Sequence, residues 1–369
     1  MNILILFSQP WRVGGAETHT EALIKGLAGH NVSLIVNDGS DQAKLDQMRK
    51  RYAYVTIDSI QTRGANLLRW QRDFQKLCRL IQERSIDVIS AQQRTSGIWA
   101  YFLHRRLAIP YTVTMHDPWH RAMFKPLYAK LFHDVFAVSR NLADHLVTNF
   151  KIASEQVHVI NNGIDFTAFH PLEKAACRTA LGLGDEDKII LHVSRLSRVK
   201  GAVALQVIAS MEMVLKENPQ AKLIIIGEGP LRQEIDMKLS QCKARFGQRF
   251  EIRNFVDNLL LWYNAADVLV GEGRVAMETL ACEKPIVAIR NGESFIGAIR
   301  AANIAYACDV NFDGRDNVVN PSRLAAEILI SFGVSPAECK EIASYIKTRL
   351  SIEAMVNQYL AVFEKLTAR

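Results

Sequence analysis

The sequence turns on the stretch Gly271-Glu-Gly-Arg-Val-Ala-Met-Glu-Thr-Leu-Ala-Cys-Glu-Lys-Pro285, which directly follows the apolar run Val268-Leu-Val270. This order is typical of a strand, a glycine-rich turn and a helix in an α/β sheet. Glycine lets the backbone approach a ligand closely, and the helix that follows offers unpaired N–H groups to phosphate. Glu278 lies about one turn into that helix, where its carboxylate can accept hydrogen bonds from two neighbouring hydroxyls, as on a ribose. The stretch therefore predicts a nucleotide site.

Short apolar runs alternate with helical patterns along almost the whole chain, which is typical of parallel sheets covered by helices. The first series of runs extends from 3–7 to 157–160, and the second extends from 188–193 to 305–307. Between them lies a turn-rich break with Asn161-Asn-Gly163, Pro171 and Gly182-Leu-Gly184. We therefore expect two Rossmann-like domains that face each other across a cleft, with ligands beyond the carboxyl ends of the strands.

Length and composition agree with a two-domain protein, since 369 residues exceed what one core usually serves. No apolar run reaches the roughly 18 to 20 residues of a membrane span, and Met1-Asn-Ile-Leu-Ile-Leu-Phe7 predicts a buried strand rather than a signal peptide. The six cysteines show no CxxC pair and no zinc spacing, so we expect buried thiols, a cytoplasmic location and no metal site.

The net charge of +7 is uneven, because residues 1–170 hold 20 Lys and Arg against 14 Asp and Glu. Such an excess suits an anionic partner, and a solvated surface explains it equally well. It comes without a nucleic-acid motif, so we expect no nucleic-acid binding. The first strand is not followed by GxGxxG, which argues against a nicotinamide dehydrogenase.

Several polar or glycine-containing segments follow predicted strands. Arg195 and Lys200 bracket the loop after residues 188–193 and offer donors suited to phosphate, although a solvated basic loop is the alternative. His116 ends the run 111–115 and faces the predicted cleft, although a lone histidine is usually structural. Weaker candidates, which plain turns or helix caps explain equally well, are Gly14, Gly15, Asn162 and Gly227. Val256 is a further weak candidate, at a position from which backbone atoms could read a base.

Taken together, these segments resemble the retaining nucleotide-sugar glycosyltransferases of glycosyltransferase family 4, which have the two-domain GT-B fold. The residues that carry the resemblance run in family order over nearly the whole chain: Gly14-Gly-Ala-Glu17, Thr114-Met-His116-Asp117, Ala137-Val-Ser139, Ile160-Asn-Asn-Gly-Ile-Asp165, Arg195-Leu196 with Lys200-Gly201, Ile226-Gly-Glu-Gly-Pro230 and Glu278-Thr-Leu-Ala-Cys-Glu-Lys-Pro285. The resemblance implies an N-terminal acceptor-side domain (1–165), a C-terminal donor domain (186–350) and a last helix (351–369) that returns to the N-terminal domain.

The resemblance also implies roles for individual residues. Arg195 and Lys200 would hold the donor diphosphate, Glu278 the ribose, and Val256 the base through its backbone. Gly15 would contact phosphate or sugar from the opposite wall, and His116 would touch the donor sugar. The reaction would retain anomeric configuration without a metal or cofactor, and the donor nucleotide would be UDP rather than GDP.

One segment departs from the family pattern. The family usually places two glutamates eight positions apart, and the position eight before Glu278 is Val270. Either Glu272 substitutes for the missing glutamate beside Gly273, or the contact with the donor sugar is lost. Arg274 stands where small or apolar residues are common, and it is a candidate for reaching the diphosphate or a charged sugar.

The sequence does not specify the acceptor. A glycan, a lipid-linked sugar, a polymer and a small molecule are all compatible with it. Residues 119–132 mix basic and aromatic side chains, which suits a helix on the inner face of an anionic membrane. A helix packed on the core, as also expected for residues 67–81, is the alternative. Two other functions share the architecture: a GT-B nucleotide-sugar epimerase, and a partner protein that binds a nucleotide sugar but has lost transfer.

Overall fold

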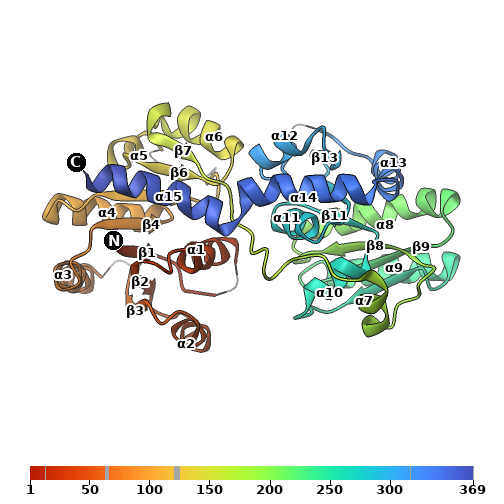
Figure 1. The fold of residues 1–369 in the computed structure, drawn as a ribbon, viewed down its shortest axis with the longest axis horizontal. Coiled ribbons are helices and arrows are strands. Elements are labelled where there is room, and N and C mark those ends of the chain that lie inside the picture. Colours follow the sequence, from red (N-terminus) through yellow and green to blue (C-terminus); the bar gives the residue numbers. More distant parts are fainter. Residues whose placement is uncertain (13, 63–65, 120–124, 316, 369) are drawn as a thin grey trace. The chain divides into compact units, whose positions relative to one another are not determined.

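The computed structural model describes residues 1–12, 14–62, 66–119, 125–315 and 317–368 (Figure 1). The chain forms two compact units, each with its own sheet. Unit 1 comprises Met1–Gly163 and Ile352–Arg369, and unit 2 comprises Ile164–Ser351. The prediction of two Rossmann-like α/β sheets is confirmed.

Unit 1 contains a seven-stranded parallel sheet with the order β3-β2-β1-β4-β5-β6-β7. The order reverses between β1 and β4, and in such sheets ligands bind at the carboxyl ends beside this point. Five of the six β1 side chains are buried, as a central strand covered on both faces requires. The strands are β1 (Asn2–Phe7), β2 (Asn31–Asn37), β3 (Val55–Ile60), β4 (Val88–Gln92), β5 (Tyr111–Met115), β6 (Val135–Ala137) and β7 (Val157–Val159). The helices are α1 (Gly15–Gly26), α2 (Gln42–Arg51), α3 (Leu67–Glu83), α4 (Arg94–Leu107), α5 (Lys125–Leu131), α6 (Arg140–Phe150) and the 3-10 helix η1 (Ser154–Gln156).

Unit 2 contains a six-stranded sheet with the order β10-β9-β8-β11-β12-β13, in which only the edge strand β13 runs antiparallel. Its strands are β8 (Lys188–Val193), β9 (Ala221–Ile226), β10 (Phe250–Arg253), β11 (Val268–Gly271), β12 (Ile286–Asn291) and β13 (Ser294–Ala298). Its helices are α7 (Lys174–Leu181), α8 (Lys200–Glu217), α9 (Arg232–Phe246), α10 (Leu259–Ala265), α11 (Arg274–Ala281), α12 (Ile304–Asp309), α13 (Pro321–Phe332) and α14 (Pro336–Leu350).

The strand predicted at 305–307 is wrong, because these residues lie in helix α12. A short apolar run has the same appearance in a buried strand and in a buried helix. The edge strand β13 was not predicted, since its partly polar sequence shows no clear alternation.

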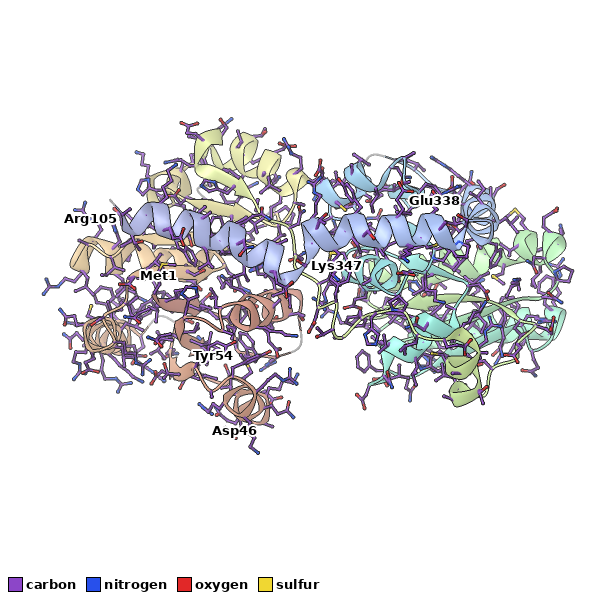
Figure 2. The ribbon with its side chains drawn as sticks, in the orientation of Figure 1. Met1, Asp46, Tyr54, Arg105, Glu338 and Lys347 are labelled. Carbon is purple, nitrogen blue, oxygen red and sulfur yellow. The ribbon has the colours of Figure 1, made fainter. Side chains whose placement is uncertain are left out.

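The last helix, α15 (Ile352–Thr367), belongs to unit 1, whereas the preceding α14, which carries Glu338 and Lys347, belongs to unit 2 (Figure 2). Its apolar side packs into the core around β1 and α1, with Met355, Val356 and Phe363 buried. Val356 lies so close to Gly26 of α1 that a larger residue at that position would clash. No helix in the described part of the chain has both the length and the apolarity to cross a membrane.

Candidate functional site

In unit 1 the candidate residues gather at the carboxyl ends of the strands. His116 follows β5, Asn162 follows β7, and Gly14 and Gly15 stand at the start of α1 after β1. Gly14 has an extended backbone and no side-chain cap, and Gly15 is exposed, with open space where a Cβ would lie. No side chain of Gly14 caps the first N–H groups of α1, and contact of the two glycines with a phosphate or sugar stays a prediction.

His116 is held by an amide that is itself oriented. Its Nε2 lies 3.1 Å from Oε1 of Gln92, and Nε2 of Gln92 donates to Oγ of Ser90 over 3.0 Å. Gln92 therefore accepts the proton on Nε2 of His116, which leaves Nδ1 as the acceptor. Burial is the main cause that lowers the pKa of His116 well below its usual range, and the neighbouring His19 ring adds to the effect. The imidazole is therefore neutral at physiological pH and can accept a hydroxyl hydrogen.

A buried polar network lies behind His116. His19 is 1% exposed, and its ring meets that of His116 edge to face at 4.9 Å. Its Nδ1 lies 2.8 Å from Oδ1 of Asn162, and its Nε2 lies 2.9 Å from the hydroxyl of Tyr359 on α15. The same hydroxyl lies 2.9 Å from Oγ1 of Thr114 on β5. One set of directions satisfies all three contacts: Thr114 donates to Tyr359, Tyr359 to His19, and His19 to Asn162.

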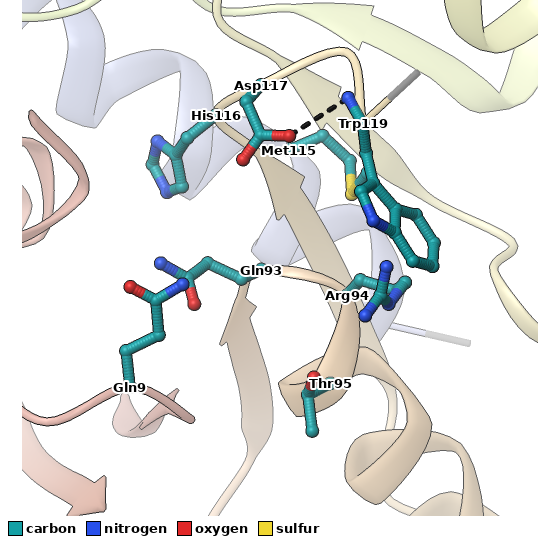
Figure 3. Close-up of a pocket in the computed structure, with 8 residues that line it drawn as sticks. All are labelled: Gln9, Gln93, Arg94, Thr95, Met115, His116, Asp117 and Trp119. Carbon is teal, nitrogen blue, oxygen red and sulfur yellow. Dashed lines mark hydrogen bonds between the residues drawn. The ribbon is translucent and has the colours of Figure 1, made fainter. Parts of the chain in front are cut away.

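A pocket of about 190 Å³ opens beside His116 at the ends of β1, β4 and β5 (Figure 3). It is lined by Gln9, Gln93, Arg94, Thr95, Met115, His116, Asp117 and Trp119. Two amides, a carboxylate, an imidazole and a guanidinium therefore surround one small volume. Oδ1 of Asp117 accepts from the backbone N–H of Trp119 at 2.9 Å, which shapes the turn above the pocket.

In unit 2 the stretch 268–285 has the predicted order of strand (β11), glycine turn and helix (α11). Gly273, with φ of 54°, precedes α11 in the left-handed region that glycine adopts readily. Glu278 lies on α11 and is 6% exposed. Its Oε1 accepts from Arg274 at 2.8 Å, and its Oε2 accepts from the Tyr263 hydroxyl at 2.9 Å. Burial raises the pKa of Glu278, while Arg274 opposes that rise.

In the structure Arg274 pairs with Glu278, and its contact with a diphosphate or a charged sugar stays a prediction. The spacing of four residues on one helix explains the pairing, because such residues face each other. The second acidic candidate, Glu272, lies 3.2 Å from Nζ of Lys200 at the start of α8 and 3.9 Å from Nε of Arg290. The structure thus brings Glu272 and Lys200 together, in agreement with a shared site around the loop.

The remaining candidates of unit 2 lie at neighbouring strand ends. Arg195 follows β8 and is exposed, and within the described residues it forms no ion pair. Val256 follows β10 and is half-buried. Gly227 follows β9 with φ of 155°, and a Cβ there would collide with the carbonyl of Ser194. Close packing of two loops therefore accounts for this glycine, and its contact with phosphate stays a prediction.

Sequence reasoning missed Gln9, His19, Gln92, Gln93 and Tyr359. The rule that made His116 a candidate also applies to the two glutamines, because Gln92 ends β4 and Gln93 follows it. Tyr359 is separated from Thr114 by 245 residues, and nothing in the local sequence signals their contact.

Two other expectations concern metals and membranes. Among the residues that the structure describes, no three His, Cys, Asp or Glu side chains gather as a metal site would require. The predicted basic and aromatic helix at 119–132 lies partly outside the described residues, which resume with α5 at Lys125.

Comparison with known families and structures agrees with this geometry. Residues 13–168 match the profile of Glycosyltransferase Family 4, and residues 173–315 match that of Glycosyl transferases group 1. The chain is 26% identical to an alpha-monoglucosyldiacylglycerol synthase of Streptococcus pneumoniae over 60% of its length, which covers 55% of that protein. It is also 26% identical to an uncharacterised glycosyltransferase of Methanocaldococcus jannaschii, with 75% of this chain and 77% of that protein aligned.

Solved structures share the whole fold. A glycosyltransferase from Rickettsia africae superposes with a TM-score of 0.76 and 16% identity, covering 99% of this chain and 98% of that chain. HepE of Anabaena, solved in complex with UDP, gives a TM-score of 0.76 and 17% identity, covering 99% and 100%. The two family profiles, which follow each other along one chain with two Rossmann-like sheets, show that this protein belongs to the GT-B glycosyltransferases of family 4 and group 1.

Proposed function

We propose that this protein is a retaining glycosyltransferase that moves a sugar from a nucleoside-diphosphate sugar to a hydroxyl acceptor. The observation that carries the proposal is the buried carboxylate of Glu278 on α11, directly after a glycine turn at a strand end. A buried carboxylate is costly unless it is paired, and such groups are common at functional sites. A ribose provides two adjacent hydroxyls that can replace the Arg274 and Tyr263 contacts.

We assign the phosphate chemistry to three cations that follow strands of unit 2, Arg195 and Lys200 after β8 and Arg274 after β11. Arg195, Lys200 and Arg274 lie at or near helix N-termini, where backbone N–H groups add to their field. As the bond from the anomeric carbon to the diphosphate breaks, these cations neutralise the charge that develops on the leaving group. In front-face attack the leaving phosphate oxygen takes the acceptor's proton, so the scheme needs neither a metal nor a protein carboxylate as base.

His116 contributes to the reaction in unit 1. Its neutral imidazole, fixed by Gln92, is suited to accepting a hydrogen bond from a donor-sugar hydroxyl. A neutral ring is required here because an imidazolium would have no acceptor and would repel positive charge on the reacting carbon.

UDP is the nucleotide that we propose, since the similar HepE fold holds UDP. The named relatives include one whose product is a glucosylated diacylglycerol and several that act on D-inositol 3-phosphate. We therefore propose either a lipid-linked or a small polar acceptor, and for a lipid-linked acceptor a cytoplasmic protein that contacts an anionic membrane. Leu67 and Leu68 of α3 are 80% and 82% exposed, and exposed apolar side chains of this kind favour such a contact.

The test of the donor site is thermal stability in the presence of UDP, GDP, ADP and CMP and their sugars. A ligand at about 100 times its dissociation constant adds about 2.7 kcal/mol, which shifts the melting temperature visibly. We expect a shift with UDP that is lost in Glu278→Ala, while circular dichroism shows the fold intact. If no nucleotide shifts wild type, or if Glu278→Ala binds and turns over normally, the proposal fails.

The altered loop supports a second candidate, a partner protein that binds the nucleotide sugar without transferring it. Val270 stands at the position of the family's first glutamate, and Lys200 holds Glu272. Donor hydrolysis separates the candidates, because a transferase releases UDP from its donor slowly in the absence of acceptor and a non-catalytic partner releases none. An epimerase instead converts the donor sugar without releasing UDP.

A further inference from the structure

Gln93 has a backbone conformation that is normally restricted to glycine. Its φ of 88° and ψ of 163° lie in a region where an L side chain is strained. The conformation is fixed from both sides, because its N–H donates to the Thr114 carbonyl at 2.8 Å and its own carbonyl accepts from Gly97 at 3.0 Å. This glutamine connects the end of β4 to the start of α4, a position where glycine would be relaxed.

The side chain of Gln93 adds a second unfavourable feature. Its Oε1 is buried, and it has no hydrogen-bond partner among the described residues. A buried acceptor without a donor is rare in folded proteins, because it has lost water and gained nothing in exchange. Neither feature stabilises the fold. Strain and an unsatisfied group at the same residue point to a ligand that supplies the missing donor.

The surroundings of Gln93 indicate the chemistry of that ligand. The pocket of about 190 Å³ is smaller than the roughly 300 Å³ or more of drug-sized sites and is suited to a single sugar ring. The amides of Gln9 and Gln93 and the hydroxyl of Thr95 both donate and accept, which matches hydroxyl groups. Asp117 and Arg94 contribute one charge of each sign, so the pocket does not select an ion.

We propose that this pocket binds one sugar or polyol ring, with Oε1 of Gln93 accepting a hydrogen bond from a ring hydroxyl. Arg94, stacked on Trp119, forms the wall on the α4 side. Because His116 lines the same pocket, the bound ring lies beside the group to which we assign the donor sugar. Identifying the ring as part of the acceptor rests on the proposed function, whereas binding of the ring does not.

The experiment measures sugar binding without any nucleotide. Saturation-transfer NMR would follow glucose, galactose, mannose, N-acetylglucosamine and myo-inositol at concentrations up to tens of millimolar. We expect saturable binding of at least one of them, at least tenfold weaker binding in Gln93→Gly, and weaker binding in Gln9→Ala. Because glycine relaxes the backbone, Gln93→Gly should melt about 2 to 4 °C higher than wild type.

A matched control exists on the same helix. Ala108 ends α4 with φ of 58°, so Ala108→Gly also relaxes a strained residue, but away from the pocket. It should raise the melting temperature similarly and leave sugar binding unchanged. The proposal is overturned if none of the probes binds, if Gln93→Gly binds as wild type does, or if Gln93→Gly melts lower while Ala108→Gly melts higher. Failure of UDP to bind wild type would reject the proposed function alone, since this assay contains no donor.

Discussion

The candidate sites of the two units differ in the kind of polar contact that they contain. At the site of unit 1, His19, Tyr359 and Thr114 form a buried chain of neutral hydrogen bonds behind His116. At the site of unit 2, the contacts are ion pairs, Lys200 with Glu272 and Arg274 with Glu278. The first set is almost fully buried, whereas the side chains of Lys200 and Arg274 are 44% and 32% exposed.

This difference suits ligands of different charge. Neutral hydrogen bonds in a closed network hold one geometry, because each group that moved would be left buried and unsatisfied. In these ion pairs the cations are partly exposed, so each can leave its carboxylate when a stronger anion arrives. We therefore infer that the neutral network of unit 1 positions uncharged hydroxyl groups rigidly. In unit 2, by contrast, the cations can leave their carboxylates and bind a diphosphate.

The largest effect is expected for Tyr359→Phe, which breaks the buried hydrogen-bond network of unit 1. The change leaves Nε2 of His19 buried without its donor, at a cost of about 2 kcal/mol of local stability. Hydrogen exchange at the amides of β4 and β5 would measure this loss, while the affinity of unit 2 for UDP should stay unchanged. Tyr345→Phe removes a hydroxyl from exposed surroundings on α14 and serves as the control. Unchanged exchange in Tyr359→Phe would show that the network is not a rigid frame.

Unit 2 also contains a buried histidine, His192, whose neutral state can be tested by varying the pH. Burial lowers the pKa of His192 to about 4, with Val270 and Ser194 as hydrogen-bond partners. The unfolded state therefore binds the proton first. The stabilisation is complete above pH 6.5 and is lost as the pH falls toward 4, by about 1.4 kcal/mol per pH unit. Urea unfolding across this range should show a slope for His192→Asn that is shallower by about that amount. Equal slopes would contradict a neutral His192.

The sequence predicted the sheets of both units better than the polar contacts at their candidate sites. Alternating apolar runs led to both sheets because burial on two faces dictates composition, and the run at 305–307 misled because three apolar residues carry no period. Positions beyond the ends of predicted strands made His116, Lys200 and Glu278 candidate residues, and their roles stay predictions. Tyr359 and His19 lie far apart in sequence, so only the fold joins them. The pairing of Arg274 with Glu278 follows from their spacing of four residues and was predictable from the sequence.

Arg274→Ala tests whether the ion pair exchanges its partner. If the guanidinium leaves Glu278 for the diphosphate, the variant should bind UDP about tenfold more weakly, as expected for one half-exposed charged hydrogen bond. Uridine, which has a ribose but no phosphate, should bind no more weakly than to wild type, because it no longer competes with Arg274 for Glu278. Isothermal titration with both ligands measures the contrast, and Arg274→Lys should retain most of the UDP affinity. Equal losses for uridine and UDP would mean that the pair only supports the fold.

The smallest effect, and the sharpest test of the comparison, is expected for Glu272→Ala. Glu272 pairs with Lys200, and if Lys200 binds the diphosphate, removing Glu272 should tighten UDP binding by about threefold at low salt. The gain should fade as salt screens the competing charges, whereas a gain from altered packing would persist. Turnover of a UDP-sugar should fall in the same variant if Glu272 replaces the missing first glutamate, since the donor sugar would lose its acceptor group. Tighter UDP binding with slower turnover would therefore mean that Glu272 pairs with Lys200 in the free protein and contacts the donor sugar during the reaction. Weaker UDP binding would instead show that Lys200 needs Glu272 to stay in place.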